Sequence, residues 1–375
     1  MAEIRIQERT PADDIVGWDL RSSATVRLLK RSGFEPGAQG LALSALAAIR
    51  LGTTAPKVEC DFAEPTSVDA LIQTPFASAF GFALTRLSSA LVFEGRTASA
   101  SFKRLLSEYY KRKRGVLGTG QSYSVVCADP VFALPPALGV SAAIPSPESF
   151  PPPSAFYSLL NSVVRDLGFR SVLVSSVGTG ITSFVYEALR NSLEHGITQD
   201  AVRKTRSTRA LIVEKIVLQN FETPSKRFSD ELNDYVERIK EAHRDDLGLG
   251  VLCLTVVDQG DGIQSTLPIE PGEDAGARLA RAFRPGESRK PQGMVSRGLG
   301  LPSIVSAAHH LRALVRITSG DLVVGQDFSL SASKYPEIDF QSLRKLPDNC
   351  VCGTSISVFV PEYAFDVDQV PLFGR

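Results

Sequence analysis

Histidine, cysteine and tryptophan are scarce in this chain of 375 residues, which contains four, five and one of them, respectively. The cysteines are scattered and odd in number, which argues against the disulfide framework of a small secreted domain. Cys350 and Cys352 lie close together, but no second cysteine or histidine pair stands near them to complete a zinc site. We therefore expect reduced cysteines and a cytoplasmic protein.

Long apolar runs are absent, and neither sign of charge dominates. No uninterrupted apolar run approaches the ~20 residues needed to cross a bilayer, and the N-terminal segment MAEIRIQERTPADD lacks the apolar centre of a signal peptide. The 41 lysines and arginines balance 41 aspartates and glutamates, which argues against a protein built mainly to coat nucleic acid. We expect no membrane partner, and nucleic acid stays an open alternative.

One local basic run occurs at residues 109–115, YYKRKRG. Four consecutive cations from Lys111 to Arg114, behind two tyrosines, are compatible with nucleic acid or a phosphorylated partner. The alternative is a helix C-terminus, where cations meet the negative end of the helix dipole and Gly115 caps the last turn. We favour the helix end.

Residues 1–130 show alternating strand and helix patterns, which predict a small α/β domain with a regulatory or interaction role. The predicted helices cover residues 40–50, 75–91 and 98–114, and the predicted strands cover residues 57–62, 90–93 and 122–128. Prolines then become dense, so residues 131–153 are expected to form an extended linker.

Residues 154–375 form the second predicted domain, which also mixes strands and helices. Helices are expected at residues 155–167 and 229–244, and strands at residues 211–221, 249–257, 314–318, 322–330 and 355–360. Helices with one apolar stripe must bury it against a sheet, so this pattern predicts a mixed sheet with helices on one face.

The most informative stretch is residues 183–196, SFVYEALRNSLEHG, which has the composition of a helix. Glu187 and Asn191 are four residues apart, so their side chains lie on one face of the helix, one turn apart. Val185 and Leu189 belong to an apolar stripe that would bury the other side. A carboxylate and an amide, with His195 a turn later, are therefore expected to face a cavity.

A second motif, VVDQGDGI, covers residues 256–263. Asp258 stands where a buried strand ends and a turn begins, so its carboxylate is aimed with little freedom. Gly260 and Gly262 let the backbone turn tightly before Ile263 and approach a ligand without a Cβ atom in the way.

Two further motifs follow, RGLGLPSIV at residues 297–305 and GTSISVFVP at residues 353–361. In the first, Gly298 and Gly300 precede a helical run, where exposed N–H groups and the positive end of the helix dipole form an anion site. Arg297 adds a cation beside it. The second reads as a strand that carries Thr354 near its start.

These four motifs, in this order and at these separations, resemble the GHKL superfamily of gyrase, heat-shock chaperone, histidine kinase and MutL-type ATPases. The resemblance covers about residues 154–361 and implies a C-terminal Bergerat-fold α/β sandwich that binds ATP and Mg²⁺. By this resemblance, Asp258 accepts a hydrogen bond from the adenine amine, and Thr354 supports adenine binding.

The resemblance also assigns the phosphate side of the site. Asn191 would supply one oxygen ligand to Mg²⁺, which takes its remaining ligands from phosphates and water. Glu187 would orient or deprotonate the attacking water. The residues expected to lie near the phosphates are His195, Arg297, Gly298, Leu299, Gly300 and Leu301.

Residues 264–296, between two of the motifs, are rich in glycine and charge, which suits a mobile lid over the nucleotide. Arg284, Arg289 and Lys290 are candidate phosphate cations, although solvated loop charges are an equal alternative.

The leading hypothesis is a Mg²⁺-dependent, ATP-hydrolysing switch that signals its nucleotide state to the N-terminal domain or to a protein partner; a homodimer is one candidate assembly. No histidine precedes His195, so the phosphoacceptor helix of an orthodox histidine kinase is not expected. The last predicted strand lies close to Arg375, so we expect no second domain to supply a catalytic lysine. The alternative is a protein kinase acting in trans, histidine-kinase-like or anti-sigma serine-kinase-like.

Overall fold

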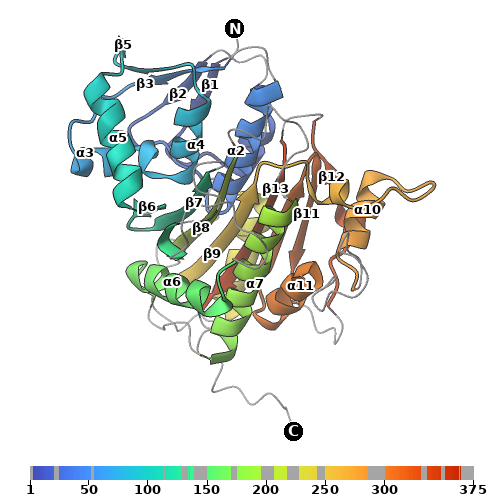
Figure 1. Cartoon of the computed structure of the whole chain (residues 1–375). Helices are drawn as coiled ribbons and strands as arrows, with labels where there is room; N and C mark the ends of the chain where they lie inside the picture. The colour runs from blue at the N-terminus through green and yellow to red at the C-terminus, as the bar shows by residue number, and fades with distance from the viewer. Residues whose placement is uncertain are drawn as a thin grey trace.

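The computed structural model contains a five-stranded mixed sheet and an eight-stranded antiparallel sheet, with helices between and around them (Figure 1). The chain is therefore mixed α/β, as the sequence predicted. The structure describes residues 3–20, 25–51, 55–113, 115–128, 134, 136–138, 150–169, 175–195, 207–217, 228–242, 250–285, 300–330, 336–347, 351–362 and 364. Among the helices of these segments, none is long and apolar enough to cross a membrane.

The smaller sheet has the order β1-β2-β3-β4-β5, in which the first four strands run parallel and β5 pairs antiparallel with β4. Its strands are β1 Glu3–Ile6, β2 Thr25–Leu28, β3 Lys57–Cys60, β4 Ala90–Phe93 and β5 Arg96–Thr97. The accompanying helices are α1 Ala12–Val16, α2 Ala38–Leu46, α3 Val68–Ile72, α4 Ala79–Leu87 and α5 Ala100–Arg112. The helices expected around residues 40–50, 75–91 and 98–114 are confirmed in α2, α4 and α5.

The basic run lies at the C-terminus of α5, as expected. Lys111 and Arg112 occupy the last turn, where their charges meet the negative end of the helix dipole. Gly115 has a φ of 82°, the left-handed conformation that glycine adopts without a steric cost.

The larger sheet has the order β12-β11-β10-β13-β9-β8-β7-β6, and every neighbouring pair is antiparallel. Its strands are β6 Val116–Thr119, β7 Ser122–Ala128, β8 Thr208–Val217, β9 Gly250–Asp258, β10 Leu314–Ser319, β11 Leu322–Asp327, β12 Arg344–Lys345 and β13 Thr354–Pro361.

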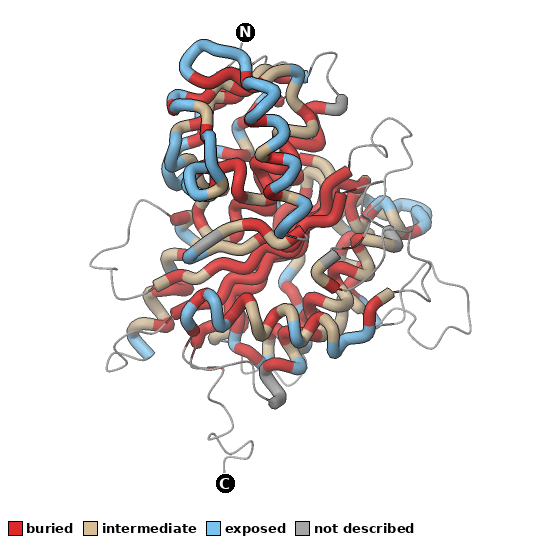
Figure 2. Tube along the Cα trace, turned by 60° about the vertical axis from the view of Figure 1, so that its left-hand side comes forward, coloured by how far each residue is buried: buried red, intermediate tan, exposed pale blue. Residues whose placement is uncertain are grey.

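Both faces of the larger sheet are covered by helices. Side chains of β9 alternate between the two faces and show which helices pack on each. Leu254 and Val256 point to the face that packs against α6 Pro153–Asp166, α7 Ser175–His195 and α11 Gly300–His310. Val257 joins the core of α2 and α4, and Cys253 packs against α9 Asp230–Ala242 on that same second face. The central strands are accordingly buried along their length (Figure 2).

The expected mixed sheet with helices on one face is therefore wrong in two respects. The larger sheet is antiparallel, and α2, α4 and α9 cover its second face. Strand β7, which the sequence placed at the end of the first domain, pairs with β8. Val125 and Val126 of β7 pack on opposite faces, so this strand needs cover on both sides. Most of the predicted linker, residues 131–153, lies outside the described residues.

A buried ion-pair network fixes the segment that leads into α2. Arg316 on β10 donates to Glu231 at 3.0 Å, to Glu35 at 3.4 Å and to the Ser229 hydroxyl at 2.6 Å. Glu35 is fully buried and also accepts the Ser229 N–H. Burial raises the pKa of Glu35, and the charge of Arg316 opposes that rise. Removing either partner would leave an uncompensated buried charge.

Two helix glycines provide a matched test of this packing. At Gly40 in α2, a Cβ atom would lie 2.4 Å from Thr255 Cγ2 and 2.5 Å from Ser355 Oγ, so Gly40→Ala is expected to destabilise the protein by about 1–3 kcal/mol. At Gly180 in α7, the nearest atoms would be 3.9 Å away, so Gly180→Ala is expected to stabilise it by up to about 1 kcal/mol. Urea unfolding measures both, and equal effects would contradict the close approach of α2.

Candidate functional site

Asp258 lies at the end of β9, directly opposite Thr354 on β13. Its Oδ1 atom accepts the N–H of Gly260 at 2.9 Å and the N–H of Thr354 at 3.2 Å. The residue is only 6% exposed. Because both hydrogen bonds from described residues arrive at Oδ1, the Oδ2 atom is left as an acceptor for a further donor.

Burial raises the pKa of Asp258 to about 6. The two backbone N–H groups and the positive charge of Arg209 act in the opposite direction, because they favour the ionised form. Arg209 is buried on β8, one position before the residue that pairs with Val257. The four motifs did not include Arg209, because only the pairing of β8 with β9 brings it near Asp258.

The turn after Asp258 and the residue before β13 both use glycine. Gly262 has a φ of 89° and Gly353 has a φ of 87°, a conformation that residues with a Cβ atom rarely adopt. A Cβ atom at Gly353 would also lie 2.2 Å from the carbonyl oxygen of Asp258. The start of the last motif therefore packs directly on the second motif, as the pairing of β9 with β13 requires.

A small hydrogen-bond network ties this turn to β10. The N–H of Ile263 donates to Ser319 Oγ at 2.7 Å, and the same hydroxyl donates to Gln264 Oε1 at 2.6 Å. Gln264 Nε2 donates a hydrogen bond to the Ser319 carbonyl oxygen at 3.2 Å. Sequence reasoning missed Gln264 and Ser319, because a single polar residue in a turn or at a strand end carries no signal by itself.

Glu187 and Asn191 lie together on α7, and the first residue of α11 packs against both. A Cβ atom at Gly300 would lie 3.0 Å from Asn191 Nδ2 and 3.2 Å from Glu187 Oε2. At these distances a side chain at position 300 would be tight, and Asn191 or Glu187 would have to shift by a few tenths of an ångström. Leu301, which follows, packs against the core that α7 and α11 share.

The residues of the four motifs are thus brought to one face of the larger sheet. Asp258 and Thr354 lie on the face that α7 and α11 cover, and Glu187, Asn191 and Gly300 form the contact between these two helices. An amide oxygen and a carboxylate are the ligand types that Mg²⁺ prefers, so this pair suits a metal that takes other ligands from phosphate. Among the described residues, no three side chains of His, Cys, Asp or Glu group as a metal site of their own.

Several expected residues lie outside the described part of the chain. These are Arg297, Gly298, Leu299, Arg289, Lys290 and the side chain of His195. The described part of the predicted lid contains the helix α10 Ala275–Ala282, whose Arg281 pairs with Glu273 at 2.7 Å. Arg284, just after α10, is exposed.

No family model matches the chain, and no curated protein matches it.

The buried carboxylate of Asp258 has a measurable consequence. Its folded-state pKa is raised, so its contribution to stability is fully present only below its ordinary pKa and is lost as the pH rises through about 6. Asp258→Asn removes this dependence. The unfolding free energy of the variant relative to wild type should rise by about 2–3 kcal/mol between about pH 4 and pH 7. Parallel stability profiles would contradict the burial of a charged group here.

Proposed function

We propose that this protein is a Mg²⁺-dependent ATP-binding and ATP-hydrolysing switch with a GHKL-type site in its second part. The observation that carries the proposal is the contact of Gly300 with both Glu187 and Asn191, on the sheet face that also presents Asp258. Residues 109 positions apart, such as Asn191 and Gly300, meet there with no side chain between them.

Adenine recognition is assigned to Asp258. Its Oδ2 atom is the acceptor left after Oδ1 has taken two backbone N–H groups, and an exocyclic amine supplies the matching donor. Guanine presents a carbonyl oxygen at the corresponding position, which would face the carboxylate and be repelled. The site therefore favours ATP over GTP.

Phosphate binding is assigned to the N-terminus of α11. Free N–H groups and the positive end of the helix dipole favour an anion there. Because Gly300 has no side chain, this end of the helix approaches Glu187 and Asn191 closely. Mg²⁺, when bound, would neutralise phosphate charge, with the Asn191 amide oxygen as its protein ligand.

Glu187 is assigned to catalysis. It lies one helical turn before Asn191, so its carboxylate can orient a water molecule toward the terminal phosphate and accept its proton. General-base catalysis of this kind typically contributes about 10²–10⁴ in rate.

Gln259 supports a route from this site to the N-terminal part. Its side chain points away from Asp258 and donates from Nε2 to the Leu43 carbonyl of α2 at 2.7 Å. Its Oε1 atom accepts the Thr208 N–H at 3.1 Å. Because Asp258 and Gln259 are adjacent, a shift of the adenine-binding carboxylate would move a residue that is bonded to α2.

One experiment distinguishes the catalytic role of Glu187 from the binding role of Asp258. Glu187→Ala is expected to keep ATP binding and lower phosphate release by about 10²–10⁴, whereas Asp258→Asn should weaken binding itself. Calorimetry and a phosphate-release assay, each with and without Mg²⁺, measure the two quantities. Glu237→Ala on α9, on the opposite face of the sheet, is the matched control and should change neither.

Equal loss of binding in the Glu187 and Asp258 variants would contradict the assigned roles. Incubation with ATP labelled at the terminal phosphate tests the output. If the label appears on a protein rather than as free phosphate, the protein is a kinase acting in trans and the switch hypothesis is wrong.

Signalling through Gln259 predicts a change in α2. Hydrogen exchange over residues 38–46 should slow when ATP and Mg²⁺ bind to the wild type, and this effect should be smaller in Gln259→Ala, which loses both hydrogen bonds. The outer helix α5, residues 100–112, is the internal control. Unchanged exchange in α2, with ATP demonstrably bound, would exclude this route.

A further inference from the structure

A cavity lies on the face of the larger sheet opposite to Asp258, where that sheet meets the smaller one. Its volume is about 310 Å³. Ile6 and the loop from Lys30 to Phe34, at the carboxyl ends of β1 and β2, form one part of its wall. Residues between Ile72 and Phe80, Gln39 of α2 and residues of the strands β6, β7 and β8 form the rest. Open sheets with parallel strands commonly bind ligands at the carboxyl ends of their strands.

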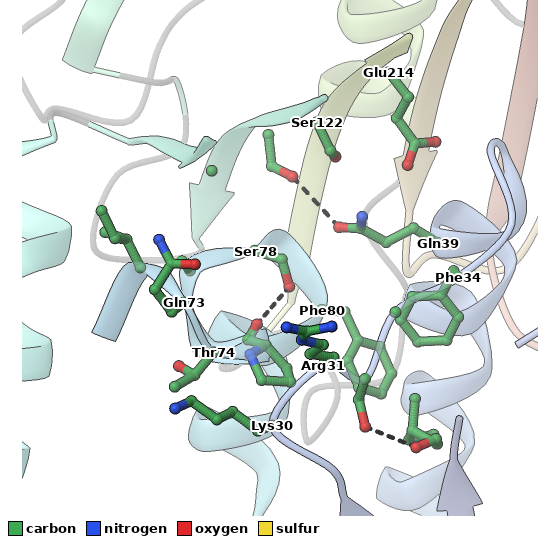
Figure 3. A pocket seen from close by; sticks show the side chains of 18 residues that line it. Lys30, Arg31, Phe34, Gln39, Gln73, Thr74, Ser78, Phe80, Ser122 and Glu214 are labelled. Carbon is green, nitrogen blue, oxygen red and sulfur yellow. Dashed lines mark hydrogen bonds between the residues drawn. The ribbon is translucent and has the colours of Figure 1, made fainter. Parts of the chain in front are cut away.

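Two cations stand at this cavity. Lys30 and Arg31 are exposed and line it (Figure 3), and neither forms an ion pair with any described residue. Cations without a partner beside a cavity favour an anionic group on the ligand, and arginine suits a carboxylate or phosphate best because it can bind in a bidentate manner.

Buried polar side chains mark another part of the wall. Gln39 and Glu214 are each 6% exposed and line the cavity (Figure 3). Glu214 accepts the Gly37 N–H at 2.8 Å, and Gln39 Oε1 accepts a hydrogen bond from the Ser124 hydroxyl at 3.4 Å. Burial raises the pKa of Glu214 to about 7. A donor on the ligand, such as an amine, would stabilise this carboxylate in its ionised form.

Part of the cavity wall is apolar and aromatic. Phe34 and Phe80 meet edge to face with their ring centroids 4.8 Å apart, and Ile72 and Pro75 also line the wall. The volume lies at the lower end of the range for small-molecule sites, which is about 300–1,000 Å³, so a peptide or a nucleic-acid strand does not fit inside. A flat ring matches this wall.

We propose that this cavity binds a small aromatic or heterocyclic metabolite with an anionic group held by Lys30 and Arg31 and an amine held by Glu214 and Gln39. The anion is a phosphate or a carboxylate, since the two cations recognise both. The inference is independent of the proposed ATP site, because Glu214 and Asp258 point to opposite faces of the larger sheet.

The test uses two probes with the purified full chain. Cytidine monophosphate carries a phosphate and a ring amine, and 4-aminobenzoate carries a carboxylate and a ring amine. Uridine monophosphate and benzoate, which lack the amine, are their controls. Calorimetry at concentrations up to about 5 mM covers the weak end of specific binding. We expect one amine-bearing probe to bind and its control to bind at least about tenfold more weakly.

Variants then locate the binding. Arg31→Ala removes a cation from an exposed position and should weaken binding about tenfold or more. Glu214→Gln keeps an oxygen for the Gly37 N–H but replaces the acceptor that faces the ligand, so it should also weaken binding. Arg5→Ala, at an exposed position of β1 outside the cavity, is the matched control and should have no effect.

The identity of the probe that binds decides between a phosphate and a carboxylate. The proposal is overturned if neither amine-bearing probe binds. It is equally overturned if binding survives both the Arg31 and the Glu214 substitutions, or if Asp258→Asn abolishes it instead, because the ligand would then occupy the ATP site.

Discussion

The burial of β9 on both faces is the constraint on which the rest of the structure depends. All nine of its residues are buried, with α7 and α11 over one face and α2 and α9 over the other. Successive side chains of a strand point to opposite faces of the sheet, so the last residue of β9 and the residue after it contact different layers of helices. Asp258 faces the helix that carries Glu187, and its neighbour Gln259 is bonded to α2.

The close fit of α2 against the sheet requires both small residues and buried charge. Gly40 meets Thr255 and Ser355 at distances that leave no room for a side chain. Beside it, Glu35 and Arg316 form a buried ion pair that holds the preceding segment. Such pairs contribute little net stability but are costly to break, so they select one position for α2 on the sheet. The same position brings Gln39 of α2 to the cavity wall together with Glu214.

Local structure could be read from the sequence to a large extent. The helices and strands that the periodicity predicted are present with shifted ends, and the run after Tyr110 ends a helix as its charges indicated. The sheet arrangement could not be read in this way. Strand β7 would have the same pattern in either sheet. Both of its faces are apolar and must be buried, but the pattern does not indicate which elements pack against them.

By itself, the sequence determined the local chemistry of the candidate site: Glu187 and Asn191 one turn apart, Asp258 at a strand end, and glycines where the backbone turns. Tertiary structure alone decided that Gly300 packs on Glu187 and Asn191, that Arg209 approaches Asp258, and that Gln259 reaches α2. The physical reason is the separation along the chain of the residues that interact. Helical spacing and turn conformation depend on neighbours in the chain, whereas these contacts depend on strand pairing and on which helix covers each face.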